Sequence, residues 1–101
     1  MIRHVVIWKF KEAADGYDRL TNMERVKREL EALPRRMPGI IRSLEVGLND
    51  LENKTNYDLI LIVDFDGYQE LDVYTKHPEH LKVADLVAKV REQRVAVDYK
   101  V

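Results

Sequence analysis

Cysteine is absent from the sequence, which excludes disulfide bonds, thiolate catalysis and cysteine-ligated metal sites. Neither sign of charge is in excess, because 17 lysine and arginine residues stand against 18 aspartate and glutamate residues. Domains that bind nucleic acid normally carry a basic face and a surplus of lysine and arginine. We therefore expect no nucleic-acid partner.

Long hydrophobic runs are also missing. The chain enters an alternating pattern at Ile2, without the apolar core of a signal peptide or a stretch long enough to span a membrane. Repeats, linkers and low-complexity tracts are absent as well. A length of 101 residues suits one domain. We expect a cytoplasmic protein with a single domain over residues 1–101 and no membrane association.

The sequence does contain a regular order of strand and helix patterns. Alternation of apolar and polar residues predicts strands over 2–11, 40–49, 57–65 and 94–101. Helical spacing of apolar residues predicts helices over 20–33, from 67 to 74 and after Pro78. The resulting order predicts an α+β fold of the ferredoxin-like βαββαβ type, with a four-stranded antiparallel sheet.

Two helices can cover only one face of such a sheet, so the other face determines the quaternary structure. Strand parity assigns these apolar residues to the uncovered face: Val5, Ile7, Ile41, Ile60, Ile62 and Ala96. The charged residues expected around them are Arg3, Lys9, Asp58, Asp64, Arg94 and Lys100. An apolar centre with a charged rim is typical of a protein interface. We expect a two-fold homodimer in which two sheets pack face to face.

The most informative stretch is His77-Pro78-Glu79-His80, which closely follows Tyr74. Proline is favoured at the first position of a helix. The motif therefore predicts a break between two helices, with His77 near the cap and His80 in the first turn. Imidazole has an unperturbed pKa near neutrality, so a tyrosine and a histidine that share a pocket can transfer a proton at physiological pH.

These segments resemble the stress-responsive A/B-barrel domain family, whose members form dimeric α/β barrels. The matching segments are residues 4–11 (HVVIWKFK), Leu33-Pro34, Val46-Gly47, residues 74–80 (YTKHPEH) and Val97-Asp98-Tyr99. A polyketide cyclase of this family closes its substrate by aldol condensation, with a tyrosine and a histidine at the positions of Tyr74 and His80. The first-strand histidine of that cyclase corresponds to His4.

The resemblance implies a cofactor-free cyclase or lyase with a pocket for an apolar small molecule between sheet and helices. His80 would take a proton from a carbon beside a carbonyl, and Tyr74 would stabilise the enolate. The residues expected to bind substrate are His4, Val6, Trp8, Met23 and Leu81. The first helix departs from the cyclase, because Asn22, Met23 and Lys27 stand where the cyclase has aromatic tunnel residues.

Other interpretations of the same residues stay open. Tyr74 and His80 can be structural residues bonded to backbone or water, and His4 can be a satisfied core histidine. The domain would then be a non-catalytic small-molecule binder or a stress-associated structural dimer. We expect no metal, because a catalytic zinc site needs about three protein ligands, and no other cofactor. Strand parity places Asp98 on the dimer side, outside the site.

Overall fold

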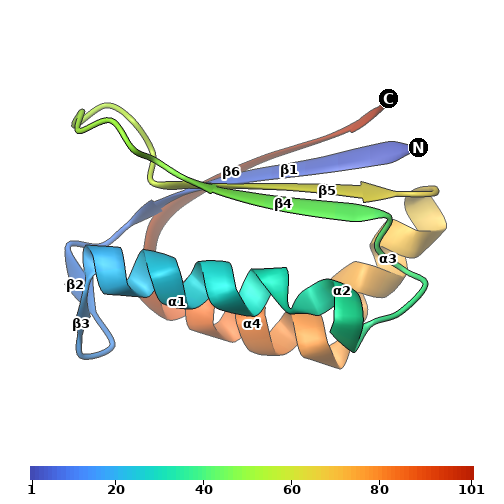
Figure 1. Cartoon of the computed structure of the whole chain (residues 1–101), viewed down its shortest axis with the longest axis horizontal. Coiled ribbons are helices and arrows are strands. Elements are labelled where there is room, and N and C mark those ends of the chain that lie inside the picture. Colours follow the sequence, from blue (N-terminus) through green and yellow to red (C-terminus); the bar gives the residue numbers. More distant parts are fainter.

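The computed structural model describes all 101 residues and consists of a four-stranded antiparallel sheet with helices on one face (Figure 1). Its elements are β1 (Ile2–Phe10), β2 (Ala13–Ala14), β3 (Tyr17–Asp18), α1 (Arg19–Glu31), α2 (Leu33–Arg36), β4 (Ser43–Leu48), β5 (Leu59–Phe65), α3 (Tyr68–Lys76), α4 (Pro78–Val90) and β6 (Arg91–Lys100). The sheet order is β4-β5-β1-β6. The predicted ferredoxin-like fold is confirmed.

One element pair was not predicted from the sequence. β2 and β3 form a two-stranded hairpin around Asp15 and Gly16, which both have positive φ angles of 55° and 82°. Two consecutive residues with positive φ suit the twist of a tight hairpin, and Asp-Gly is a preferred pair for it. Asp18 then caps α1 by accepting a hydrogen bond from the backbone N–H of Thr21 at 2.8 Å.

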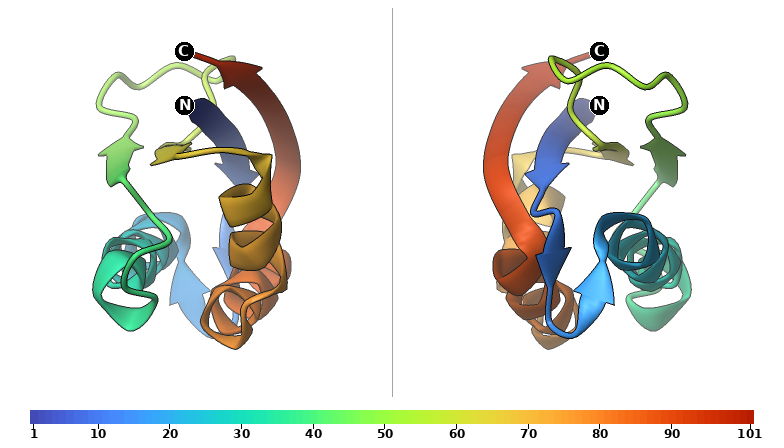
Figure 2. Two further views of the ribbon diagram at one scale, coloured as in Figure 1. Left: turned by 90° about the vertical axis from the view of Figure 1, so that its right-hand side faces the viewer. Right: turned by 90° about the vertical axis from the view of Figure 1, so that its left-hand side faces the viewer.

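The core lies between the sheet and the helices α1 and α4, which lie side by side beneath it (Figure 2). Alternate residues of the two central strands point into this core: Val6, Trp8 and Phe10 on β1, and Leu59, Leu61, Val63 and Phe65 on β5. The helices supply the opposite wall: Met23, Val26 and Leu30 on α1, with Val83, Val87 and Val90 on α4. No helix has both the length and the apolar character needed to cross a membrane.

β6 presents the opposite face from the one predicted. In its register with β1, Asp98 pairs with His4 and Val97 pairs with Val5. Directly opposed residues of an antiparallel ladder share a face. Asp98 therefore lies on the helix side, as do the remaining even-numbered residues Arg94, Ala96 and Lys100. The prediction was wrong because alternation shows which residues share a face but not which face is covered.

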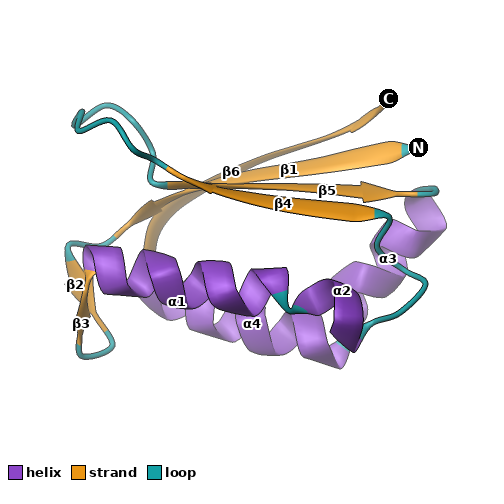
Figure 3. Ribbon diagram, viewed as in Figure 1, coloured by secondary structure: helices purple, strands orange, loops and turns teal.

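The face without helices is called the open face, and all helices lie on the other side of the sheet (Figure 3). Its apolar residues are Val5, Ile7, Ile60, Ile62, Val95, Val97 and Tyr99. Val97 is 61% exposed. Ala96 is not part of this face, and Ile41 precedes β4 and packs against the core instead. Arg3 borders the open face and donates two hydrogen bonds to Asp64, at 2.8 and 3.0 Å, which lower the pKa of that carboxyl group.

Candidate active site

A cavity of about 220 Å³ lies between the sheet and the pair of helices α3 and α4. Its wall is mostly hydrophobic and comes from β1, β5, α1, α3, α4 and the first residues of β6. Five of the predicted site residues line it: His4, Val6, Trp8, Tyr74 and His80. An apolar cavity with a few converging polar groups is the usual form of a small-molecule site.

The break between α3 and α4 positions the two predicted catalytic residues. Tyr74 lies in the last turn of α3, Pro78 begins α4, and His80 lies in its first turn. As predicted, His77 caps α4, because its Nδ1 accepts a hydrogen bond from the Glu79 N–H at 3.1 Å. The last carbonyl groups of a helix have no partner within it. One of them, Thr75 O, lies 3.1 Å from Nδ1 of His80 and fixes the ring.

This contact also determines which nitrogen of His80 is free. A carbonyl oxygen can only accept a hydrogen bond, so Nδ1 carries the proton. In the neutral ring, the lone pair is then on Nε2, which is free to act as a base. Burial lowers the pKa of His80, and the positive charges of His4, Arg94 and His77 lower it further, against the effect of the Thr75 carbonyl. His80 is therefore neutral at physiological pH.

Tyr74 is the only fully buried tyrosine, and its hydroxyl group has no hydrogen-bond partner. Its ring centroid lies 4.4 Å from that of His80 and 6.0 Å from that of His4. Burial raises the pKa of Tyr74, while the positive charge of Arg94 opposes this effect. The hydroxyl group therefore keeps its proton and can donate it to an oxygen atom that enters the cavity.

Tyr74→Phe should raise the free energy of unfolding by about 1 kcal/mol, because it removes a buried hydroxyl group that forms no hydrogen bond. The melting temperature should rise by about 4 °C for a domain of this size. Differential scanning calorimetry would measure both. A clear loss of stability would instead mean that the hydroxyl group bonds to an ordered water molecule in solution.

Asp98 lies on the helix side and contacts the cavity residue His4, although the sequence interpretation placed it on the dimer side. Oδ1 of Asp98 pairs with Nδ1 of His4, from the neighbouring strand on the helix side of the sheet. The His4 side chain is 8% exposed, so the carboxylate supplies a partner for a buried ring. Met1 and Val101 are hydrogen-bonded to each other, so the two ends of the chain lie side by side. Counting inward from these two residues places residue 98 opposite residue 4, which would have found this contact.

Two predicted pocket residues lie elsewhere. Leu81 is 49% exposed, because the inward face of α4 carries His80, Ala84 and Val87 and residue 81 points away from it. Met23 is buried in the core but does not line the cavity, which α1 reaches only at Leu30. Helical spacing was consistent with Leu81 facing inward, and only the contacts of the folded helix decide the question.

No three His, Asp or Glu side chains in the chain converge in a way that could hold a metal ion. The two histidines considered for this role, His77 and His80, both direct Nδ1 at backbone groups.

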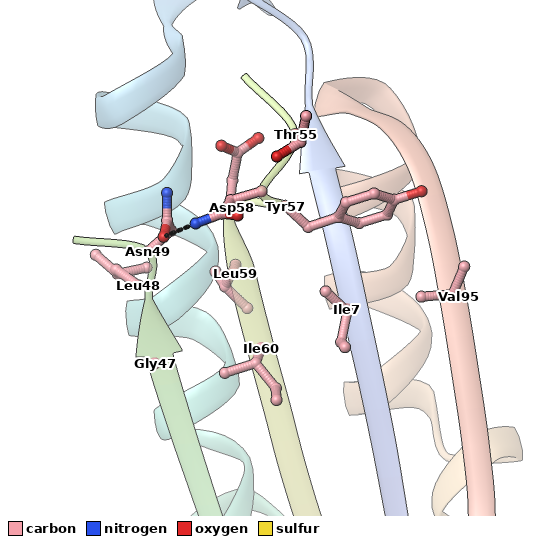
Figure 4. A pocket seen from close by; sticks show the side chains of 11 residues that line it. Ile7, Gly47, Leu48, Asn49, Thr55, Tyr57, Asp58, Leu59, Ile60 and Val95 are labelled. Carbon is pink, nitrogen blue, oxygen red and sulfur yellow. Dashed lines mark hydrogen bonds between the residues drawn. The ribbon is translucent and has the colours of Figure 1, made fainter. Parts of the chain in front are cut away.

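A second hollow lies on the open face of the sheet (Figure 4). It has a volume of about 660 Å³ and lies beside the loop that joins β4 to β5. Ile7, Ile60 and Val95 form its apolar floor, and the Tyr57 hydroxyl group donates a hydrogen bond to Gln93 at 2.7 Å. This hollow is a shallow part of the open face, and the two titratable side chains of its lining are already bonded, Tyr57 to Gln93 and Asp58 to the Phe10 N–H.

Comparison with known proteins identifies the family. The family profile described as "Stress responsive A/B Barrel Domain" matches residues 2–101. The chain belongs to this family. Among solved members of the same fold, a dimeric ferredoxin-like protein from Bacteroides fragilis is 31% identical over 99% of this chain and 95% of its own, with a TM-score of 0.84.

Two further structures extend the comparison of this A/B barrel domain. A dimeric ferredoxin-like protein from Thermobifida fusca is 26% identical, over 99% of this chain and 90% of that one, with a TM-score of 0.83. A hydroxynitrile lyase from Passiflora edulis shares the fold at 14% identity and a TM-score of 0.78, over 97% and 90% of the two chains. No curated protein matches the sequence.

Proposed function

We propose that this A/B barrel domain is a cofactor-free lyase or cyclase that makes or breaks a carbon–carbon bond beside a carbonyl group. The observation that carries the proposal is the contact between Tyr74 and His80. A buried hydroxyl group without a partner lies beside an imidazole whose Nε2 is free, at the wall of an apolar cavity. Buried polar groups are almost always hydrogen-bonded, so an unpaired one at the wall of a cavity is suited to bind a polar atom of a ligand.

The two side chains suit the two proton transfers of aldol chemistry. In the cleavage direction, Nε2 of His80 takes the hydroxyl proton, the carbon–carbon bond breaks, and its electron pair passes to the enolate. The Tyr74 hydroxyl group donates a hydrogen bond to the enolate oxygen. The proton returns from His80 to the enolate carbon, so the adduct gives one aldehyde and one ketone. Condensation is the reverse of these steps.

The relatives support this choice of chemistry. The positions of Tyr74 and His80 resemble the acid–base pair of olivetolic acid cyclase, which is a member of the same family. The hydroxynitrile lyase from Passiflora edulis has the same fold. Cyanohydrin cleavage and retro-aldol cleavage both remove a hydroxyl proton and break the adjacent carbon–carbon bond. One acid–base pair can therefore serve either reaction.

The experiment is a release assay with two small substrates, the aldol adduct of benzaldehyde and acetone and the cyanohydrin mandelonitrile. Both yield benzaldehyde, which is followed by its ultraviolet absorbance. The proposal requires release above the buffer rate, and this excess must be lost in Tyr74→Phe. If the protein binds these compounds but releases nothing, the second candidate holds. That candidate is a non-catalytic binder, favoured by the largely hydrophobic wall of the cavity.

The rate of benzaldehyde release should stay high down to mildly acidic pH. The base form of His80 is the neutral ring, and burial together with nearby positive charges lowers the pKa of His80. The midpoint of the acidic limb of kcat/KM should therefore lie below about 6.5, the ordinary value for histidine. A pH–rate profile measures it. A midpoint above that value would contradict the role of His80 as the base.

We also propose that the domain functions as a homodimer that joins the open faces of two copies. The relatives from Bacteroides fragilis and Thermobifida fusca are dimeric. In this chain the open face holds seven apolar residues, of which Val95, Val97 and Tyr99 are between 42% and 61% exposed. Soluble monomers rarely leave such a continuous apolar surface in water.

A further inference from the structure

The cavity wall carries two positive charges that have no partner in the chain. Arg91 and Arg94, at the start of β6, both line the cavity. Neither forms a salt bridge or a side-chain hydrogen bond, as is also true of Arg28 and Arg35, but Arg91 and Arg94 line the cavity, Arg91 half-buried and Arg94 exposed. Asp98, the carboxylate that the ladder places on the helix side of β6, is occupied by His4. The cavity is therefore cationic as well as apolar.

Both arginines point to the helix side, because Arg91 lies opposite Phe10 and Arg94 opposite Trp8 in the β1–β6 ladder. Arg94 is the one that acts on both catalytic side chains. Its charge reaches the catalytic groups, since it lowers the pKa of both Tyr74 and His80. A cation in this position disfavours a protonated His80 and favours any negative charge that enters the cavity.

Two buried hydrogen-bond donors of the same wall also lack partners. Trp8 and Tyr74 are 6% and 0% exposed, and neither the indole Nε1 of Trp8 nor the Tyr74 hydroxyl group has a hydrogen-bond partner. An indole N–H can only donate. The unpaired N–H and O–H groups of the cavity thus suit a ligand with hydrogen-bond acceptors. The two arginines favour acceptors that carry a negative charge.

We propose that the ligand of this cavity is a small apolar carboxylate, held by the guanidinium group of Arg94 with its carbonyl or hydroxyl oxygen at Tyr74. This inference rests on the proposed function, since it names the substrate class for the same cavity. The planar guanidinium fork matches a carboxylate through two parallel hydrogen bonds. A cavity of about 150 Å³ can hold benzene, so about 220 Å³ fits one aromatic ring with a short acid side chain.

The test compares two probes of equal shape and different charge, phenylpropanoate and phenylpropanamide, by isothermal titration calorimetry at low salt. The wild-type protein should bind the carboxylate at least about tenfold more tightly than the amide, because charge-assisted hydrogen bonds are the stronger ones. Arg94→Gln should abolish this preference by weakening only carboxylate binding. Arg94→Lys should keep part of it, since the charge stays and the fork is lost.

Arg28→Gln is the matched control, because Arg28 is exposed on α1, outside the cavity lining, and its loss should leave both affinities unchanged. Equal affinity for the two probes, a preference that survives Arg94→Gln, or no binding of either at millimolar concentration would overturn the inference. Binding is measured without turnover. A carboxylate preference in a protein that releases no benzaldehyde would therefore keep this inference and reject the catalytic one.

Discussion

His80→Ala should lower kcat for benzaldehyde release by about a hundredfold or more, the usual contribution of a general acid–base group. His80 is the histidine whose ring lies nearer to that of Tyr74, at 4.4 Å between centroids against 6.0 Å for His4, and its Nε2 is free. No carboxylate lines the cavity to replace it. The loss should appear in kcat rather than in KM, because the proton transfer belongs to the transition state.

His77→Asn is the matched control for this variant. It removes the neighbouring imidazole but leaves asparagine, which is a good N-cap, to accept the Glu79 N–H at the start of α4. Turnover should stay within about a factor of two, since His77 does not line the cavity. If both variants keep wild-type turnover, His80 is a packing residue and the acid–base mechanism is wrong.

Ile60→Glu should convert the proposed dimer to a monomer. Ile60 lies on the central strand β5, where it pairs with Ile7 of β1 and Gly47 of β4 on the open face. A glutamate there would bury an unpaired charge in the dimer, which costs about 3–5 kcal/mol. The Kd of the dimer should rise by about a hundredfold or more. Sedimentation or light scattering after gel filtration at micromolar concentration measures the change.

Leu81→Glu provides the comparison, since Leu81 is also a partly exposed apolar residue but lies on the outer side of α4. This variant should stay dimeric. A wild-type protein that is monomeric at micromolar concentration would contradict the proposed assembly. A dimer that survives Ile60→Glu but not Leu81→Glu would place the interface on the helices instead.

The orientation of the central strands could be predicted because one face of each is buried in the core and the other is not. β1 and β5 each have one face under the helices, so Val6, Trp8, Leu59 and Leu61 alternate with residues of the open face. The edge strand β6 is different. All of its residues after Arg91 are exposed, and its larger apolar side chains lie on the open face while its charged ones lie on the helix side, the reverse of the usual expectation. Periodicity alone could not orient it.

The residues of the candidate site also fall into two groups, those placed by local sequence and those placed by pairing between distant strands. Tyr74, His77 and His80 were predictable because Pro78 fixes a local break, and the positions of all three depend on backbone within seven residues. Asp98 and Arg94 were missed because their place depends on pairing between the two ends of the chain. Leu81 was misplaced because a helix can be rotated by one position without disturbing a pattern of apolar residues.

The pairing of β1 with β6 has a consequence for how the chain folds. Ile2 lies beside Lys100, and the backbone N–H of Val101 donates to the Met1 carbonyl at 3.0 Å. β1 is synthesised before the other strands of the sheet. The edge of β1 that pairs with β6 has no partner until the ten residues of β6 have been synthesised. Such non-local pairing slows folding, because the loop must close before its contacts stabilise it. The early chain is exposed to wrong strand partners during synthesis, and the charged Arg3 and Lys9 at the two ends of β1 are the kind of residue that discourages them.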